Sequence, residues 1–169
     1  MMKPVEVSCG LDFHIMRSPN ISRTDQKKEF MEATKLIGNA FGDELTNVLI
    51  YRYNFYVASL RENNMTTAAL LFKIHPNGDS IFTEIPLAVT DSNKQRRGYM
   101  QFLMGQFEKF LRKLGVGKMV LSSIKDALWF WVYKVGFATM PNWELDSFKK
   151  NNKVVLFKET VLCYKLVDV

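Results

Sequence analysis

The sequence predicts an α+β fold: a mixed β-sheet in which an antiparallel meander precedes a parallel β-α-β crossover, flanked by helices. Two observations support this prediction. Between residues 48 and 90, three runs rich in β-branched and aromatic residues are separated by turn-like segments, which is typical of consecutive antiparallel strands. From residue 100 the apolar residues recur at the helical spacing of 3.6, and a short β-like run follows. A strand, a helix and a second strand in this order form a crossover unit.

The N-terminal part of the chain is expected to contain a helix followed by three strands. A helical apolar period runs through residues 26–41 and ends at Gly42, a residue type that commonly stops helices. A first strand is expected ahead of this helix. The three strands of the meander are expected at residues 48–61, 66–75 and 80–90.

The turn between the last two of these strands carries a specific signal. Residues 76–79 read Pro-Asn-Gly-Asp, and Asn-Gly between two β-like runs favours the tight turn of a hairpin. We expect the two strands to pair there, with His75 capping the hairpin.

The C-terminal part is expected to alternate between helices and strands. Apolar residues from Met100 to Leu114 recur at the helical spacing, and Gly115 supplies the stop. A short strand, a second helix ended by Gly136 and a final β-like segment are expected at residues 118–122, 125–135 and 154–166.

Length and composition are those of a single globular domain, residues 1–169. Of the 169 residues, 47% are hydrophobic and 24% are charged, which is too apolar for a disordered chain. No run approaches the roughly 18 apolar residues of a membrane span, and the N-terminus lacks the apolar segment of a secretory signal. Two cysteines and two histidines exclude a zinc finger and a disulfide framework. We expect a protein of the nucleus or cytoplasm that binds no metal, with Cys163 in its core.

Positive charge is concentrated between residues 91 and 118. The chain carries 23 Lys and Arg against 17 Asp and Glu, a formal net charge of +6, and seven of the cations fall in this stretch beside two acids. A solvated helix face is one explanation. The others are a site for an anionic small molecule and a nucleic-acid surface, whose affinity would fall steeply with salt.

A basic loop precedes the helix that begins near residue 100, and it reads Gln95-Arg96-Arg97-Gly98-Tyr99-Met100. The first amides of a helix have no intrahelical acceptor and carry partial positive charge, which together favour an anion. Gly98 would let the backbone approach such a ligand closely, and the neighbouring cations add charge. The loop is expected to be either a phosphate-binding loop or a plain solvated turn.

This loop resembles the Q/R-x-x-G-x-G/A pyrophosphate loop of the GNAT superfamily of acetyl-CoA-dependent N-acyltransferases. Its setting is similar too: a strand, the loop, an amphipathic helix, a short strand, and a helix that ends at Gly136-Phe137. The resemblance implies a GNAT-type mixed sheet that uses acetyl-CoA as cosubstrate and no metal.

The strand before the loop indicates which branch of the superfamily this chain resembles. Residues 82–89, Phe-Thr-Glu-Ile-Pro-Leu-Ala-Val, are similar to the F-A-E-I strand of the histone acetyltransferase branch. With the segment 155–160, they resemble the acetyltransferase domain of plant nuclear PHD-finger proteins of the increased DNA methylation type. The resemblance runs from about residue 51 to residue 166, and the chain has no cysteine cluster for a PHD finger.

The resemblance implies roles for Glu84 and for the backbone that follows it. Glu84 would be the general base that takes a proton from the acceptor ammonium, helped by burial among apolar neighbours. The Ala88 amide would polarise the thioester carbonyl. The alternative for Glu84 is a solvent-facing strand residue or one end of a surface salt bridge. The residues implied to contact the cosubstrate are Leu87, Ala88, Val89, Gln95, Arg96, Arg97, Gly98, Tyr99 and Met100.

Two positions depart from the pattern of the superfamily. Met100 replaces the final Gly or Ala of the loop. Val132 stands where many members have a Tyr that protonates the departing CoA thiolate, and Tyr133 lies one residue away, about 100° around the helix. The aromatic residues of this helix could form a wall of the acyl or CoA site, but at least two are expected on its buried face: Trp129, Phe130, Trp131 and Tyr133.

We therefore expect an acetyl-CoA-dependent N-acyltransferase that acts on a primary amine, such as a lysine of a histone or another nuclear protein. The net positive charge does not favour a basic acceptor tail. The alternative, which Val132 and Met100 favour, is a GNAT-fold module that binds CoA weakly or serves protein interaction. Neither nucleic acid nor a membrane is expected as a direct partner.

Overall fold

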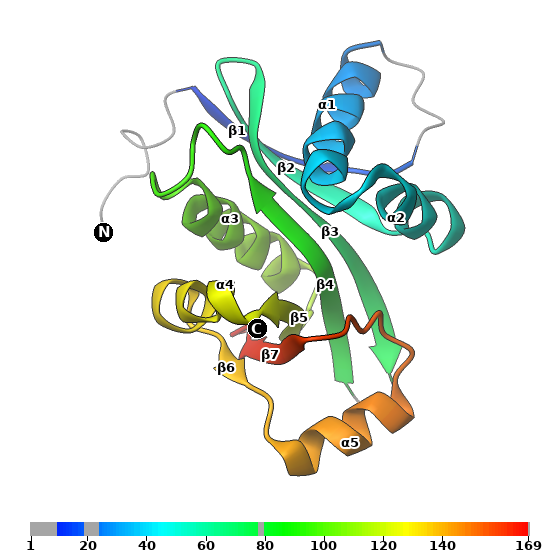
Figure 1. Ribbon diagram of the computed structural model, residues 1–169. Helices are drawn as coiled ribbons and strands as arrows, with labels where there is room; N and C mark the ends of the chain where they lie inside the picture. The colour runs from blue at the N-terminus through cyan, green and yellow to red at the C-terminus, as the bar shows by residue number, and fades with distance from the viewer. Residues whose placement is uncertain (1–9, 19–23, 78–79, 169) are drawn as a thin grey trace. The chain divides into compact units, whose positions relative to one another are not determined.

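The structure is a computed structural model that describes residues 10–18, 24–77 and 80–168 (Figure 1). Seven strands in these residues form one mixed sheet in the order β1-β2-β3-β4-β5-β7-β6, flanked by helices. The predicted α+β fold is therefore confirmed. The strands are β1 (Leu11–Met16), β2 (Tyr56–Glu62), β3 (Met65–Asn77), β4 (Ser80–Thr90), β5 (Lys118–Ile124), β6 (Ala138–Thr139) and β7 (Thr160–Leu166). The helices are α1 (Thr24–Phe41), α2 (Asp43–Asn47), α3 (Tyr99–Lys113), α4 (Lys125–Trp129) and α5 (Asn142–Asn151), with π-helical turns η1 (Val48–Arg52) and η2 (Phe130–Val135).

The parallel crossover predicted from the sequence is present. β4 pairs in parallel with β5, with Phe82 opposite Lys118, and α3 connects the two strands. β5 then pairs antiparallel with β7. β2, β3 and β4 are consecutive neighbours in the sheet, as the meander predicts. The predicted hairpin turn falls partly on Gly78 and Asp79, which lie outside the described residues.

The chain divides into two compact units. The first unit is Met1–Leu71 with Ala88–Gln106, and the second is Phe72–Leu87 with Phe107–Val169. β3, β4 and α3 each contribute residues to both units. The expectation of one domain over residues 1–169 stays a prediction.

In the first unit, α1 has the buried face that its apolar period predicts. Phe30, Ala33 and Ile37 are buried at the helical spacing, and full burial of a large apolar side chain contributes about 1.5–3 kcal/mol. The helix ends before Gly42, whose φ of +101° suits a residue without Cβ. α2 follows at once and lies beside α1 (Figure 1).

The predicted strand at 48–61 is wrong over its first half. η1 covers Val48–Arg52, and β2 begins only at Tyr56. Leu49 and Ile50 are buried within η1. Burying each of these side chains contributes about 1.5–3 kcal/mol, whereas the β-propensity of a single residue varies over only about 1 kcal/mol. Packing therefore overrides the local strand preference of these residues.

In the second unit, α5 packs through Phe148 against residues of β4, β5 and β7. Cys163 of β7 is fully buried, as predicted, and desolvation raises the pKa of its thiol to about 11. The buried cluster between α5 and the strands consists of Phe82, Val120, Met140, Phe148 and Leu162.

Two expectations for the C-terminal segment are wrong. α5 forms at Asn142–Asn151, where the sequence predicts no element, and the strand expected at 154–166 begins only at Thr160. α5 is mostly polar and buries Phe148, so it lacks the apolar period by which a helix is recognised. The helix expected at 125–135 is confirmed in extent, because α4 continues into η2 and ends at Gly136.

Candidate active site

Glu84 is a buried carboxylate with a partner on each oxygen. It lies on β4 opposite Val120 of β5, and only 4% of its surface is exposed. The backbone N–H of Val155 donates to Oε1 at 2.5 Å, and Nε2 of His75 lies 2.7 Å from Oε2. The alternatives of a solvent-facing strand residue and of a surface salt bridge are therefore excluded.

His75 comes from β3, and its ring contacts two residues of β4. It pairs with Glu84 and stacks on Phe82, with centroids 4.8 Å apart and planes 11° from parallel. The expectation that His75 caps the hairpin concerns a turn that lies partly outside the described residues. Phe82 in turn meets Phe148 of α5 edge to face at 5.3 Å. Sequence reasoning missed this pairing. The available signal was that β3 and β4 were expected to be adjacent, so polar residues near each other across the hairpin were candidate partners.

The surroundings of Glu84 are apolar along the strand and supply hydrogen bonds to the carboxylate. Its neighbours along β4, Phe82, Ile85 and Leu87, are buried, as the sequence predicts. An ionised carboxylate is costly to bury unless it is hydrogen-bonded, and here two groups supply that compensation. An ionised carboxylate has two oxygens with about four acceptor positions, so the two bonds leave capacity for another proton.

β4 is longer than the part of it that pairs with β5. The registered pairs in these fully described strands run from Phe82 to Ile85, while β4 extends to Thr90. The amides of Leu87, Ala88 and Val89 are therefore not part of that ladder. Leu87 is buried, whereas the other two are half-buried.

The basic loop starts from a fixed turn in the first unit. The Asp91 N–H donates to the Thr67 carbonyl at 2.8 Å, and the Asp91 side chain accepts from the Asn93 N–H at 2.9 Å. The Lys94 N–H then donates to the Asp91 carbonyl at 2.8 Å. Such an Asx-type turn directs the chain out of β4 and into the loop.

Two residues of the loop have positive φ angles. Arg96 has a φ of +64° and Gly98 of +82°. A left-handed conformation at a residue with a side chain costs on the order of 1–3 kcal/mol and occurs often at ligand sites. A Cβ built on Gly98 would meet no atom within 4 Å, so the space beside this glycine is open. Gln95, Arg96, Arg97 and Gly98 are all exposed.

Glu62 at the end of β2 holds both ends of this loop. Tyr99 Oη donates to Glu62 Oε2 at 2.5 Å, and Lys94 Nζ donates to the same oxygen at 3.1 Å. These two hydrogen bonds, that from Tyr99 first, lower the pKa of Glu62 below its ordinary value, and the bond to Glu62 raises the pKa of Tyr99. Sequence reasoning missed Glu62, which lies 37 residues before Tyr99 and carries no local signal.

Met100, one of the two departures, points into the interior. Its side chain is 8% exposed, and it stands in the first turn of α3, whose first bond joins the Phe102 N–H to the Gly98 carbonyl at 2.9 Å. The extra bulk of methionine is therefore packed in the core.

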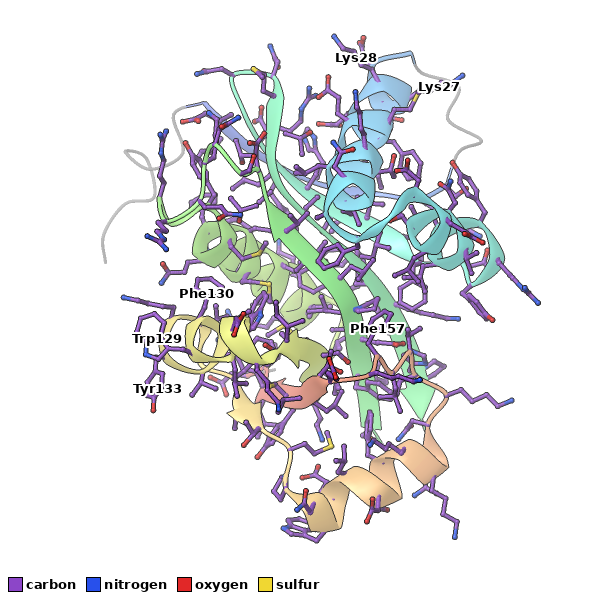
Figure 2. The ribbon with its side chains drawn as sticks, in the orientation of Figure 1. Lys27, Lys28, Trp129, Phe130, Tyr133 and Phe157 are labelled. Atoms are coloured by element: carbon purple, nitrogen blue, oxygen red, sulfur yellow. The ribbon has the colours of Figure 1, made fainter. Side chains whose placement is uncertain are left out.

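The aromatic residues of α4 and η2 face different ways. Trp131 is buried against Phe137, with ring centroids 5.8 Å apart, and Phe130 is half-buried. Trp129 and Tyr133 are 59% and 74% exposed, and Figure 2 shows them on the outer side of this segment. The expectation that at least two of the four are buried is therefore wrong, because Trp131 alone is.

The basic stretch is partly neutralised. Lys94 pairs with Glu62, Lys118 with Glu144 at 3.0 Å, and Arg112 approaches Glu108 at 3.9 Å. The other four cations of the stretch are exposed: Arg96, Arg97, Lys109 and Lys113.

A second buried carboxylate, Glu29 of α1, belongs to the first unit. Oε1 of Glu29 accepts from Arg61 NH1 at 3.1 Å and lies 2.5 Å from Nδ1 of His14. Arg61 also donates to Glu32 at 2.9 Å. This carboxylate has a permanent cation beside it, whereas Glu84 has an imidazole and a backbone amide.

Among residues 10–18, 24–77 and 80–168, no three His, Cys, Asp or Glu side chains gather in a way that could hold a metal ion. In the same residues, no helix combines the length and the apolar character needed to cross a membrane.

Comparison with known proteins identifies two kinds of similarity. The model of the family described as the C-terminal domain of Increased DNA methylation 1 matches residues 33–166. Increased DNA methylation 1 of Arabidopsis thaliana is 28% identical over 108 residues, which are 64% of this chain and 9% of the relative. The chain thus corresponds to a small part of that protein.

Solved structures are similar over nearly the whole chain. The crystal structure of Tetrahymena GCN5 has a TM-score of 0.75 at 17% identity, covering 93% of this chain and 96% of that one. The catalytic domain of Tetrahymena GCN5 histone acetyltransferase in complex with coenzyme A has a TM-score of 0.67 at 17% identity, covering 94% and 93%. Identities this low show a shared fold, the one expected from the loop motif.

Proposed function

Because this chain belongs to the family of the Increased DNA methylation 1 C-terminal domain, we propose that it is an acetyl-CoA-dependent N-acetyltransferase acting on a primary amine. The observation that carries the proposal is Glu84, a buried carboxylate hydrogen-bonded on both oxygens. It lies on the strand that leads into the basic loop. Acetyl-CoA would supply the acetyl group as a thioester, which is activated toward amines.

Glu84 would act as the general base. An acceptor amine is an ammonium at neutral pH and must lose a proton before its lone pair can react. A carboxylate removed from bulk water and fixed in position can take that proton. The Ala88 N–H would donate to the acyl carbonyl oxygen, where negative charge develops, a role that needs no side chain.

The loop would hold the pyrophosphate of the cosubstrate through its backbone. The positive φ angles of Arg96 and Gly98 and the open space beside Gly98 fit a loop whose amides face an anion. The exposed side chains of Arg96 and Arg97 add charge. Met100 stands where the superfamily has Gly or Ala, but its side chain is buried and so leaves the space of the loop open. The amides of Gln95 to Met100 and of Leu87 to Val89 are the proposed contacts.

The acceptor that we propose is a lysine of a histone or of another nuclear protein, which implies a nuclear location. The similarity in fold to a histone acetyltransferase and the family relationship support this proposal.

A second candidate function rests on η2. Val132 is half-buried at the position of the superfamily's acid, and Tyr133 is exposed. A chain without this acid could bind CoA and serve as an interaction module without turnover. Binding and transfer must therefore be measured separately.

The loop assignment predicts the effect of Gly98→Asp. This substitution places a negative charge in the proposed anion site, so acetyl-CoA affinity should fall about 10²-fold or more. The measurement is a thermal shift, because a ligand at 100 times its Kd stabilises the folded state by about 2.7 kcal/mol. The fold should survive, since Asp tolerates positive φ better than most residues and the space is open.

Two matched variants separate charge from conformation. Gly98→Asn has nearly the shape of Gly98→Asp without the charge, and should retain most of the affinity. Gly115→Asp puts the same residue at a glycine with a φ of +72° and equally open space, outside the loop, and should bind normally. Undiminished affinity in a folded Gly98→Asp protein would show that the loop does not hold the pyrophosphate.

A further inference from the structure

We propose that His75 is a positioning residue for Glu84: it donates a hydrogen bond from Nε2 to Oε2 and fixes the carboxylate in the orientation that proton transfer requires. The inference rests on the proposed function, in which Glu84 is the base. All the residues that carry it lie in the second unit.

The hydrogen bonds of Glu84 define a fixed carboxylate. The Val155 N–H holds Oε1 at 2.5 Å, and His75 Nε2 holds Oε2 at 2.7 Å. If only one oxygen were hydrogen-bonded, the carboxylate could still turn about its Cγ–Cδ bond. With both oxygens held, one from β3 and the other from the segment between α5 and β7, the plane of the carboxylate is set.

The imidazole is itself held in place. Its ring stacks on Phe82 at 4.8 Å, and Phe82 packs edge to face on Phe148 within the buried cluster under α5. Phe82 and Glu84 are two residues apart on β4 and so lie on the same face of the strand. One strand therefore presents both the surface on which the ring rests and the carboxylate to which it bonds.

The direction of the hydrogen bond follows from the chemistry of the base. An ionised carboxylate only accepts hydrogen bonds, so the ring nitrogen that faces Glu84 must carry the hydrogen. Neutral His75 is then the Nε2–H tautomer. His14 presents the other nitrogen, Nδ1, to Glu29, so the same argument gives it the opposite tautomer. The tautomers of the two histidines can therefore be compared within one protein.

A purely structural role for the pair makes a different prediction. A contact that only joins β3 to β4 would lower stability when lost and leave the turnover of the folded protein unchanged. A positioning role lowers turnover in folded protein, because misplacing a reacting group by about 1 Å can cost on the order of 10²-fold.

The test uses two amide variants of different reach. The amide nitrogen of His75→Gln can take the place of Nε2, whereas that of His75→Asn corresponds to Nδ1 and cannot reach Glu84. Release of CoA thiol from acetyl-CoA is measured with purified core histones as acceptor. In folded protein, His75→Asn should lower kcat by about 10–100-fold with little change in the KM for acetyl-CoA, and His75→Gln should recover most of the loss.

The second readout needs no activity. In the 169-residue chain labelled with ¹⁵N-histidine, at a pH where both rings are neutral, NMR should show the hydrogen on Nε2 of His75 and on Nδ1 of His14. A hydrogen on Nδ1 of His75 would mean that Glu84 is the donor, and would overturn the inference.

The outcomes separate this inference from the function on which it rests. If the wild-type chain transfers acetyl groups and His75→Asn does so equally well, or if His75→Gln is as impaired as His75→Asn, the positioning role is wrong and the acetyltransferase proposal stands. If the wild-type chain binds acetyl-CoA but transfers to no amine, the proposed function fails, and the catalytic importance of His75 fails with it.

Discussion

At the level of single residues, the site depends on which groups donate hydrogen bonds to two carboxylates. Glu84 is buried and accepts from a backbone amide and an imidazole. Glu62 is more exposed and accepts from Tyr99 and Lys94. The resemblance of the strand motif predicts Glu84. Its backbone partner could not be predicted, because Val155 lies 71 residues away in a segment expected to be a strand.

Glu62 leads to a prediction about pH. Its pKa is lowered by Tyr99 and Lys94, so the stabilisation is present above the ordinary carboxyl value of 4.5 and is lost as the pH falls through the lower folded value. The pKa of Tyr99 is raised, so its contribution is present below 10.0 and is lost as the pH rises through the higher folded value. The destabilisation caused by Glu62→Gln should therefore be largest between about pH 4.5 and 10.

The measurement is the midpoint of denaturant unfolding for wild type and Glu62→Gln across this pH range. Tyr99→Phe is the companion variant. In this background, the destabilisation caused by Glu62→Gln should no longer decrease at high pH. It should still decrease at low pH, because Lys94 pairs with Glu62. If the unfolding midpoints of wild type and Glu62→Gln differ by the same amount at every pH, the hydrogen bonds of Glu62 with Tyr99 and Lys94 do not stabilise the fold in the way proposed.

At the scale of elements, the errors of sequence reasoning have physical causes. η1 forms where β-branched and aromatic residues favour a strand, because Leu49 and Ile50 are buried there in a helical conformation. α5 was not predictable from its polar sequence, since its position depends on Phe148 meeting Phe82. α1 and α3 were predictable, because their apolar residues keep the helical period over many turns.

The end of the α4–η2 segment bears on the missing acid. The Gly136 N–H bonds to the Trp131 carbonyl, five residues back, at 3.0 Å, so this turn is wider than an α-helical one. Tyr133 is 74% exposed, packs beside Trp129 at 5.9 Å and points outward (Figure 2). A side chain so placed does not substitute for a buried acid at position 132.

We therefore expect Tyr133→Phe to lower turnover by less than tenfold. A thiol with a pKa near the free cysteine value of about 8.5 can leave without a dedicated acid near neutral pH. The measurement is kcat for CoA release with acetyl-CoA affinity as the control for folding. A loss of a thousandfold with binding intact would assign the acid role to Tyr133.

At the scale of the whole molecule, the order of elements was the strongest predictor. The crossover β4–α3–β5, with the basic loop at the start of the helix, was expected from the sequence and is present. Composition and charge were less informative. The basic stretch 91–118 leaves a solvated helix face, an anion site and a nucleic-acid surface open, and three of its cations, Lys94, Arg112 and Lys118, are paired with acids. The pairs of Lys94 with Glu62 and of Lys118 with Glu144 depend on the tertiary fold and leave no pattern in the sequence, whereas Glu108 and Arg112 are four residues apart on one helix.

Glu84→Gln tests whether Glu84 is the base when this chain transfers an acetyl group. Glutamine keeps the shape and an acceptor oxygen for the Val155 N–H but cannot take up the proton. Glu144→Gln, which removes a half-buried glutamate paired with Lys118, is the matched control.

The measurement is the rate of acetyl transfer from acetyl-CoA to core histones at neutral pH, alongside acetyl-CoA affinity. Glu84→Gln should be slower by on the order of 10²–10⁴-fold, the usual contribution of a general base, with affinity nearly unchanged, while Glu144→Gln should match wild type. A Glu84→Gln protein that transfers acetyl groups at the wild-type rate would show that Glu84 is not the base.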